Sequence, residues 1–180
     1  PAFSNLHLGT AGTNVSIGGV YAGWHRSSWT ARGPMSLTRN QLAAAAVGGK
    51  LYALGGFDAA PLDLNEEYDP ATDAWTVRAA LPVGRTLLAA AAVAGKVYAV
   101  GGTGASVANT EYDPAANAWT SKAAMPTGRG YLALAAVGGK LFALGGFNGG
   151  RLTTNEAYDP AADSWTSRAP MPSSREGLAA

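Results

Sequence analysis

The sequence predicts an all-β fold made of repeated, four-stranded antiparallel sheets, and three observations lead to this prediction. A framework of tryptophan, arginine and paired glycines recurs along the 180 residues, which indicates an array of similar units. The 24 glycines and 10 prolines mark many turns. The alanine-rich segments between those turns are too short for stable helices, although alanine favours helix, so we interpret them as strands.

The repeated framework keeps its register through most of the chain. Four tryptophans, each followed by threonine, are separated by 46, 44 and 46 residues, and an arginine stands ten residues after each of them. Their strict periodicity assigns the aromatic residues of the repeat to the core rather than to a ligand. The structural repeat consists of Trp29, Trp75, Trp119 and Trp165; Gly55, Gly56, Gly101, Gly102, Gly145 and Gly146; and Tyr68, Tyr112 and Tyr158.

Each unit contains two consecutive hairpins according to its turn signals. The apolar segments at 42–47, 87–93 and 132–137 each run into a Gly-Lys turn and resume as a second apolar segment, which is typical of strand, tight turn and strand. Because these strands are apolar almost throughout, both faces of the sheet are expected to be covered by neighbouring sheets. A second hairpin follows at Asp69-Pro70, a type I turn signal, and it makes Tyr68 and Trp75 cross-strand neighbours.

Four strands per unit, repeated around an axis, form a propeller blade. The Gly-Gly pair, the tyrosine, the tryptophan after it, and the proline and arginine before the next unit resemble the kelch repeat over residues 29–175. The resemblance implies a kelch-type β-propeller with three complete blades, at about 36–81, 82–125 and 126–171, plus partial blades at both ends. A further blade starts at 172–180, and residues 1–28 form an irregular leader or a degenerate partial blade.

Closure of the propeller is a separate question. Propellers close with ~4 to 8 blades, so we interpret the sequence as a partial propeller. The alternative is a four-bladed ring, in which residues 10–30 add outer strands to a blade whose inner strand is 176–180. Without closure the outer faces of the terminal blades are apolar and uncovered, and self-association with a second copy is expected.

The composition argues against several classes of partner. The net charge is +1 and no block of like charges occurs, so we expect no nucleic-acid partner and no membrane-binding basic patch. The longest apolar run is far shorter than the ~20 residues that span a bilayer. The absence of cysteine excludes disulfides and thiolate metal sites. The bias toward alanine, glycine and arginine is typical of a bacterial protein.

No cofactor, metal site or catalytic residue is predicted. Galactose oxidase-like enzymes, which share this propeller, carry a cysteine-linked tyrosine and histidine ligands, whereas this sequence has no cysteine and its histidines, His7 and His25, lie in the leader. The rival interpretation is a carbohydrate-active channel enzyme of the sialate mutarotase type, or the propeller part of a larger enzyme. In that rival, four arginines at one mouth of the channel bind an acidic sugar, whereas their structural alternative is to donate to backbone carbonyls. They are Arg39, Arg85, Arg129 and Arg175.

Ligand-binding residues are expected where the repeats differ, which is in the loops after the Gly-Gly pairs. The candidates are Phe57, Asp58 and Asp63 in the first loop, Thr103 and Ser106 in the second, and Phe147, Asn148 and Arg151 in the third. The glutamates before the tyrosines, Glu67, Glu111 and Glu156, are interpreted as solvated strand charges. The sequence therefore predicts a non-catalytic binding scaffold that recognises a protein or a glycan through loops on one face of the propeller.

Overall fold

The structure is a computed structural model that describes residues 16–17, 20–21 and 30–180. The chain divides into two units, Pro1–Arg32 and Gly33–Ala180, and each is described by itself. In the first unit, β1 (Ser16–Ile17) pairs antiparallel with β2 (Val20–Tyr21). The predictions that concern Trp29, His7 and His25 lie outside the described residues, as does most of the predicted leader at 1–28.

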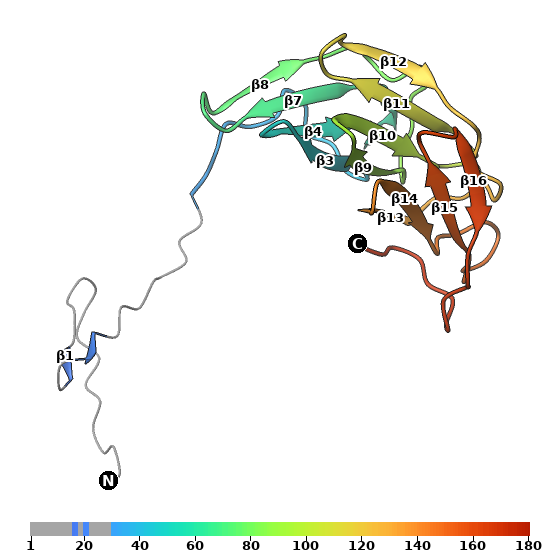
Figure 1. The fold of residues 1–180 in the computed structure, drawn as a ribbon. Helices are drawn as coiled ribbons and strands as arrows, with labels where there is room; N and C mark the ends of the chain where they lie inside the picture. Colours follow the sequence, from blue (N-terminus) through green and yellow to red (C-terminus); the bar gives the residue numbers. More distant parts are fainter. Residues whose placement is uncertain (1–15, 18–19, 22–29) are drawn as a thin grey trace. The chain divides into compact units, whose positions relative to one another are not determined.

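The second unit contains three four-stranded antiparallel sheets, and no helix occurs in the part of the chain that the structure describes (Figure 1). The first blade is formed by β3 (Ala43–Val47), β4 (Lys50–Leu54), β7 (Asn65–Asp69) and β8 (Ala74–Val77). The second is formed by β9 (Ala89–Val93), β10 (Lys96–Val100), β11 (Asn109–Asp113) and β12 (Ala118–Ser121). The third is formed by β13 (Ala133–Val137), β14 (Lys140–Leu144), β15 (Asn155–Asp159) and β16 (Ser164–Ser167). The predicted all-β fold with three complete blades is confirmed.

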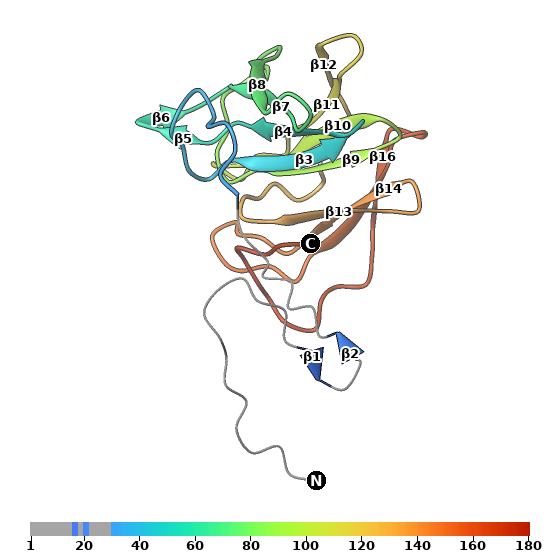
Figure 2. The same ribbon diagram turned by 90° about the vertical axis from the view of Figure 1, so that its left-hand side faces the viewer.

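The blades stand side by side with their first strands on the inside of the curve. Figures 1 and 2 show β3, β9 and β13 next to one another, with β8, β12 and β16 on the outer edge. Within each blade the strands follow chain order from inside to outside, as β3-β4-β7-β8 illustrates. A short extra hairpin of β5 (Phe57–Asp58) and β6 (Ala60–Pro61) fills the first Gly-Gly loop. One end of each blade therefore carries the loops at which the repeats differ.

The hairpin turns follow from local backbone chemistry. Gly48 and Gly49 connect β3 to β4 with φ of 59° and 75°, the left-handed values that a two-residue hairpin of this kind needs and that glycine adopts without strain. In the second hairpin, Asp69 Oδ1 accepts a hydrogen bond from the backbone N–H of Ala71 at 2.8 Å, which fixes the predicted turn. The turn sets the register that places Tyr68 opposite Trp75, with ring centroids 5.0 Å apart. The predicted cross-strand pair is confirmed.

The core lies between the blades rather than inside any one of them. Tyr52 and Leu54 of the first blade pack against Val97, Ala99 and Tyr112 of the second. The same arrangement recurs between the second and third blades. Burial on both faces of a sheet explains why its strands are apolar almost throughout and do not alternate with polar residues. The tyrosines of the repeat are buried, and the tryptophans of the three blades, Trp75, Trp119 and Trp165, are half-buried.

The repeated pair of glycines is needed because the backbone that leads into the next blade passes very close to it. Gly55 has φ of 63°, and a Cβ there would lie 2.4 Å from the carbonyl oxygen of Arg85, where the chain enters the second blade. The next glycine, Gly56, donates its N–H to that same carbonyl at 2.9 Å. Any side chain at position 55 would therefore break the joint between two blades. Gly101 stands in the same relation to Arg129.

Among the described residues, no helix is long and apolar enough to cross a membrane.

Candidate functional site

The repeated arginines lie under the loop-bearing end of the blades, and the first three are buried. Arg39 donates to the carbonyls of Ala53 and Gly55 at 3.2 and 3.1 Å and forms an ion pair of 2.8 Å with Glu66. Arg129 repeats the arrangement with Ala143 and Glu156. Donation to backbone carbonyls matches the structural role that was the alternative for these residues, although the carbonyls belong to the arginine's own blade.

The second blade departs from this arrangement. Arg85 donates to the carbonyls of Ala99 and Gly101, both at 3.3 Å, but its remaining partner is the hydroxyl of Thr110, at 2.5 Å, and not a carboxylate. Burial without a facing carboxylate lowers the pKa of the Arg85 guanidinium to about 10. In Arg39 burial also lowers the pKa, and the neighbouring carboxylate of Glu66 opposes that shift. A ligand role for these arginines stays a prediction. The fourth arginine, Arg175, is exposed and donates to the hydroxyl of Ser173 at 3.1 Å.

The interpretation of the strand glutamates as solvated charges is wrong for two of the three. Glu67 and Glu156 are 8% and 2% exposed, and Glu111 is half-buried. Glu156 pairs with Arg129, whereas Glu67 pairs with Arg78. The glutamates occupy two different positions of the repeat, one residue apart, and in a blade covered on both faces either position is buried.

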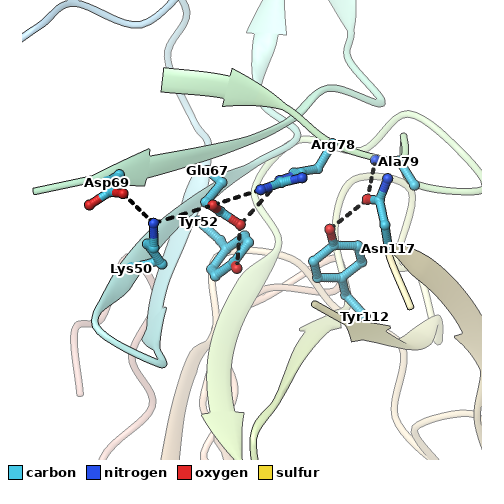
Figure 3. Close-up of polar contacts among 8 residues, drawn as sticks. All are labelled: Lys50, Tyr52, Glu67, Asp69, Arg78, Ala79, Tyr112 and Asn117. Atoms are coloured by element: carbon cyan, nitrogen blue, oxygen red, sulfur yellow. Dashed lines mark hydrogen bonds and ion pairs between the residues drawn. The ribbon is translucent and has the colours of Figure 1, made fainter. Parts of the chain in front are cut away.

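A polar network at the boundary of the first and second blades accounts for Glu67 (Figure 3). The hydroxyl of Tyr52 donates to Glu67 Oε2 at 2.6 Å, and Arg78 donates to Glu67 Oε1 at 2.8 Å. The hydrogen bond from Arg78 lowers the pKa of the Glu67 carboxyl most strongly, the one from Tyr52 lowers it further, and burial opposes both. Burial and the facing carboxylate raise the pKa of Tyr52. Because these groups satisfy one another, the network belongs to the framework.

Lys50 extends the network at the β3–β4 turn. Its ammonium forms an ion pair with Asp69 and lies 3.9 Å from Glu67 Oε1 (Figure 3). Lys140 and Asp159 form the corresponding pair of the third blade, at 2.6 Å. These pairs lie at the end of β4 and β14 opposite to the Gly-Gly loops. These two lysine–aspartate pairs and the variable loops therefore occupy opposite ends of the blades.

At the loop-bearing end, an arc of backbone hydrogen bonds joins the blades at their innermost points. The N–H of Leu87 donates to the carbonyl of Gln41, that of Tyr131 to Leu87, and that of Gly177 to Tyr131, at 3.0, 3.0 and 2.9 Å. We call these four residues the inner arc. Gln41, Leu87 and Tyr131 have φ of 55°, 59° and 54°, a left-handed conformation that non-glycine residues adopt at a cost. Such strain persists only where surrounding structure enforces it, and it is frequent at functional sites.

Each Gly-Gly loop is held against the start of its own blade's inner strand. The N–H of Phe147 donates to the carbonyl of Gly130 at 2.8 Å, and the N–H of Gly130 donates back at 3.2 Å. Phe57 and Asn40 form the same pair of bonds in the first blade, and in the second the N–H of Thr103 donates to Thr86. The first residue of each loop is thereby fixed next to the inner arc, with its side chain exposed.

The loops of the second and third blades enclose a cleft of about 270 Å³. Its walls come from the inner arc and from the two loops, and glycine backbone forms much of its surface. The lining residues are Leu87, Gly102, Thr103, Gly104, Ala105, Gly130, Tyr131, Phe147, Asn148 and Gly149. We call this the loop cleft. None of its lining residues is an aspartate, glutamate, histidine, lysine or arginine.

The loop cleft gathers some of the candidate residues and leaves out others. Thr103, Phe147 and Asn148 line it together, although they come from two blades. Phe57 and Asp58 lie on the β5–β6 hairpin of the first blade, and Asp63 is exposed in that same loop. The remaining two candidates are engaged within the chain: Ser106 accepts a hydrogen bond from the N–H of Ala108, and Arg151 pairs with Glu176.

Leu87 and Tyr131 are cleft residues that the sequence did not identify. Both stand two residues after a repeat arginine, a position occupied by glutamine, leucine, tyrosine and glycine in successive units. That variability inside an otherwise regular segment was the available signal. Among the described residues, no group of three or more histidine, cysteine, aspartate or glutamate side chains is placed to hold a metal ion.

Comparison with known proteins supports the same fold. The family described as "Kelch motif" matches residues 38–82 and 128–172. The chain is similar to a solved structure titled "Structure of YjhT", with 19% sequence identity and a TM-score of 0.73. The similarity covers 83% of this chain and 57% of that one, so the chain spans just over half of that protein's length. No curated protein matches the sequence.

Proposed function

This chain belongs to the kelch family of propeller repeats, and on that premise we propose that it is a non-catalytic recognition module that binds a protein partner through the loop cleft. The observation that carries the proposal is the convergence of Thr103, Phe147 and Asn148 with Tyr131 at one hollow. These side chains come from positions at which the repeats differ. Positions that vary over a constant framework are the ones that a scaffold can adapt to a partner.

The exposed aromatic side chains support a protein partner. Tyr131 is 43% exposed and Phe147 is 39% exposed, and both border a cleft with mostly apolar walls. Aromatic residues are enriched among the few side chains that supply most of the binding energy at protein interfaces. A glycan would need more hydrogen-bonding groups than Thr103, Asn148 and the tyrosine hydroxyl provide.

The rival enzyme needs groups that the loop cleft does not supply. An acid–base mechanism requires a proton donor and acceptor within reach of a substrate, and the lining residues include no carboxylate and no histidine. An anion clamp requires accessible guanidinium groups, whereas the Arg39 and Arg129 side chains are buried against Glu66 and Glu156. These arrangements favour recognition over catalysis at this end of the blades.

Self-association through the terminal blades is a second interaction that we propose. Val137 of the third blade is 63% exposed, whereas its counterparts Val47 and Val93 pack against a neighbouring blade. Leu51 on the opposite face of the first blade is also exposed. Apolar sheet faces of this kind favour association.

Peptide display tests the recognition function. Random peptides are selected on the immobilised full chain, and the enriched sequences are measured by calorimetry against the wild type, Phe147→Ala and Val77→Ala. We expect binding that Phe147→Ala weakens and Val77→Ala leaves unchanged, because Val77 is also an exposed apolar residue, at 59%, but lies on β8, at the outer edge of the first blade. Selected peptides that bind all three chains equally, or a glycan array that gives the stronger signal, would contradict the proposal.

A further inference from the structure

We infer that the loop cleft accepts one uncharged aromatic side chain from the partner, held between Tyr131 and Phe147 beside the exposed backbone of the glycine loops. The inference rests on the proposed recognition function and specifies its ligand chemistry. It follows from the size of the cleft, the absence of charge on its walls, its aromatic border and the fixed backbone at Tyr131.

The size of the loop cleft favours a single side chain. Its volume of about 270 Å³ lies below the range of roughly 300–1,000 Å³ that is common for sites of whole small molecules. A tryptophan, tyrosine or phenylalanine side chain is smaller than a whole drug-sized molecule and still buries about 150–250 Å² of largely apolar surface. An oligosaccharide would extend well beyond the walls that enclose this space.

The absence of charge on the walls excludes an ionic anchor. Tyr131 is the only titratable side chain among the lining residues. A carboxylate or ammonium group entering the cleft would lose hydration without meeting an opposite charge, which is strongly unfavourable. The nearby Arg151 is paired with Glu176 and does not line the cleft. An uncharged ring has no such cost.

The glycine loops give a flat ring close access to the peptide backbone. Gly104 and Gly149 have φ of 71° and 72°, and a Cβ at either position would meet no atom within 4 Å. Glycine adopts this left-handed backbone without the strain that a side chain brings, and both residues present backbone atoms to the cleft. Gly102 and Gly130 add further backbone to the walls. Peptide planes and the two aromatic residues together form a surface for stacking.

The backbone of Tyr131 is fixed before any ligand arrives. Its N–H donates to Leu87 and its carbonyl accepts from Gly177, so hydrogen bonds on both sides hold its left-handed conformation. Phe147 is likewise fixed by its two bonds to Gly130. An anchor on a fixed backbone loses less conformational freedom on binding than one on a mobile loop, which increases affinity. Thr103 and Asn148 at the border supply hydrogen-bonding groups for the partner's backbone.

The chain contains a matched control for each cleft aromatic. Phe57 starts the first Gly-Gly loop as Phe147 starts the third, forms the same backbone pairing, and is 36% exposed, but it does not line the loop cleft. Gln41 occupies the inner-arc position of Tyr131 with the same φ, so Tyr131→Gln inserts a residue that this backbone already tolerates. Because the side chains of Phe57 and Tyr131 are exposed, Phe57→Ala and Tyr131→Gln are both expected to leave the fold intact.

Titration of the isotope-labelled full chain with uncharged N-acetyl-tryptophanamide, followed by NMR, tests the inference. We expect saturable shifts at Gly102, Gly104 and Gly149, and an affinity that falls roughly tenfold in Phe147→Ala and in Tyr131→Gln. Phe57→Ala should bind the probe as the wild type does. Methyl β-galactoside and the charged N-acetyl-glutamate should produce no saturable shifts in the same residues.

Three outcomes overturn the inference. They are the absence of saturable shifts with the tryptophan probe, an equal loss of affinity in Phe57→Ala, and tighter binding of the sugar or of the acidic probe. The first two leave the recognition function intact if display peptides that lack aromatic residues still require Phe147. Failure of both experiments removes the proposed function itself.

Discussion

The indole Nε1 of Trp119 donates to the carbonyl oxygen of Ala79 at 2.8 Å, across the boundary between the second and first blades. The same carbonyl accepts a second hydrogen bond from Asn65 of its own blade, at 3.1 Å. The N–H of Ala79 in turn donates to Asn117 Oδ1, which also accepts from the hydroxyl of Tyr112 (Figure 3). The segment that connects the two blades is thus hydrogen-bonded to both of them. The same joint recurs at Ala123, which is hydrogen-bonded to Trp165 and Asp163 of the third blade.

Trp119→Phe tests the energy of this joint. A smaller aromatic ring remains and the donor is lost, so we expect the free energy of unfolding to fall by about 0.5–1.5 kcal/mol for the hydrogen bond, with a further loss from the reduced packing. Trp119→Ala also removes the packing on Tyr112 and is expected to be more destabilising, by about 3 kcal/mol. Urea unfolding followed by circular dichroism gives both values, and equal losses in the two variants would contradict the role of the indole donor.

Thr110→Glu tests the buried charge of Arg85. Glutamate stands at the equivalent positions of the first and third blades, where it pairs with Arg39 and Arg129. The added carboxylate gives Arg85 the ionic partner that it lacks, and we expect a gain in stability of about 1 kcal/mol. Thr110→Gln is the uncharged control. A glutamate variant that is less stable than the glutamine variant in urea unfolding would contradict this account.

The lowered pKa of Arg85 predicts that the stability of the chain depends on pH in the alkaline range. The pKa of Arg85 is lowered to about 10 in the folded chain from 12.5, so between these values the unfolded chain binds more protons than the folded one. The contribution of Arg85 to stability therefore increases as pH rises through this window. In Thr110→Glu the increase should be smaller. Comparing the two chains by chemical unfolding at pH 9 and pH 11 isolates the effect from other alkaline titrations.

The hydrogen bonds to Asp163 predict that the stability of the chain depends on pH in the acidic range. The hydroxyl of Tyr158 and the backbone N–H of Ala123 donate to its carboxylate, and these bonds lower its pKa in that order of strength. Stability that depends on this carboxylate is present above the ordinary pKa of aspartate and is lost as pH falls through the lower, folded-state pKa. Asp163→Asn should fold and lose this part of the pH dependence, because Asn117 makes the same contacts one blade earlier. Melting temperatures from pH 2.5 to 7 provide the measurement.

Tyr52 and Glu67 are predicted to be energetically coupled. Tyr52→Phe leaves the buried carboxylate without one donor, and we expect a loss of about 1–2 kcal/mol. The double variant, with Tyr52→Phe and Glu67→Ala together, should lose less stability than the sum of the losses in the two single variants. Phe142 and Ala157 already form the equivalent cross-strand pair of the third blade. A double-mutant cycle measures the coupling, which we expect to be about 0.5–3 kcal/mol. Additive effects would show that the two groups act independently.

Sedimentation equilibrium tests self-association through the third blade. We expect association that rises with concentration and that Val137→Lys weakens, since the substitution places a charge on an apolar sheet face. Val83→Lys is the control, because Val83 is 69% exposed but lies in the connection between blades. A monomeric wild type at high concentration would contradict the proposal.

The parts of the fold that depend on local chemistry could be predicted from the sequence. The Asp69-Pro70 turn defines the register of β7 and β8, so the pairing of Tyr68 with Trp75 followed directly. The paired glycines likewise indicated where loops begin. The burial of Glu67 could not be predicted, because its partner Arg78 lies on the neighbouring connection and a glutamate in a strand ordinarily faces solvent.

The candidate site was predicted only in part for a similar reason. Loop residues such as Phe147 were identified because the loops vary in length and sequence. Tyr131 was missed because it follows a repeat arginine in a segment that otherwise matches its counterparts. Its role depends on the position of β13 beside β9, which brings Leu87 and the Thr103 loop next to it. Such a juxtaposition is a property of the stacked blades and not of any one repeat.

The inner arc has a consequence for how such a chain can be altered. Peptide groups make the bonds of the arc itself, and only at Gln41 does a side chain add to the link between blades, by accepting a hydrogen bond from the hydroxyl of Thr86. Random libraries at codons 87 and 131, joined with positions 57, 103 and 147, would change the side chains along the rim while the backbone hydrogen bonds between the blades stay constant. A single scaffold could in this way yield many different binders.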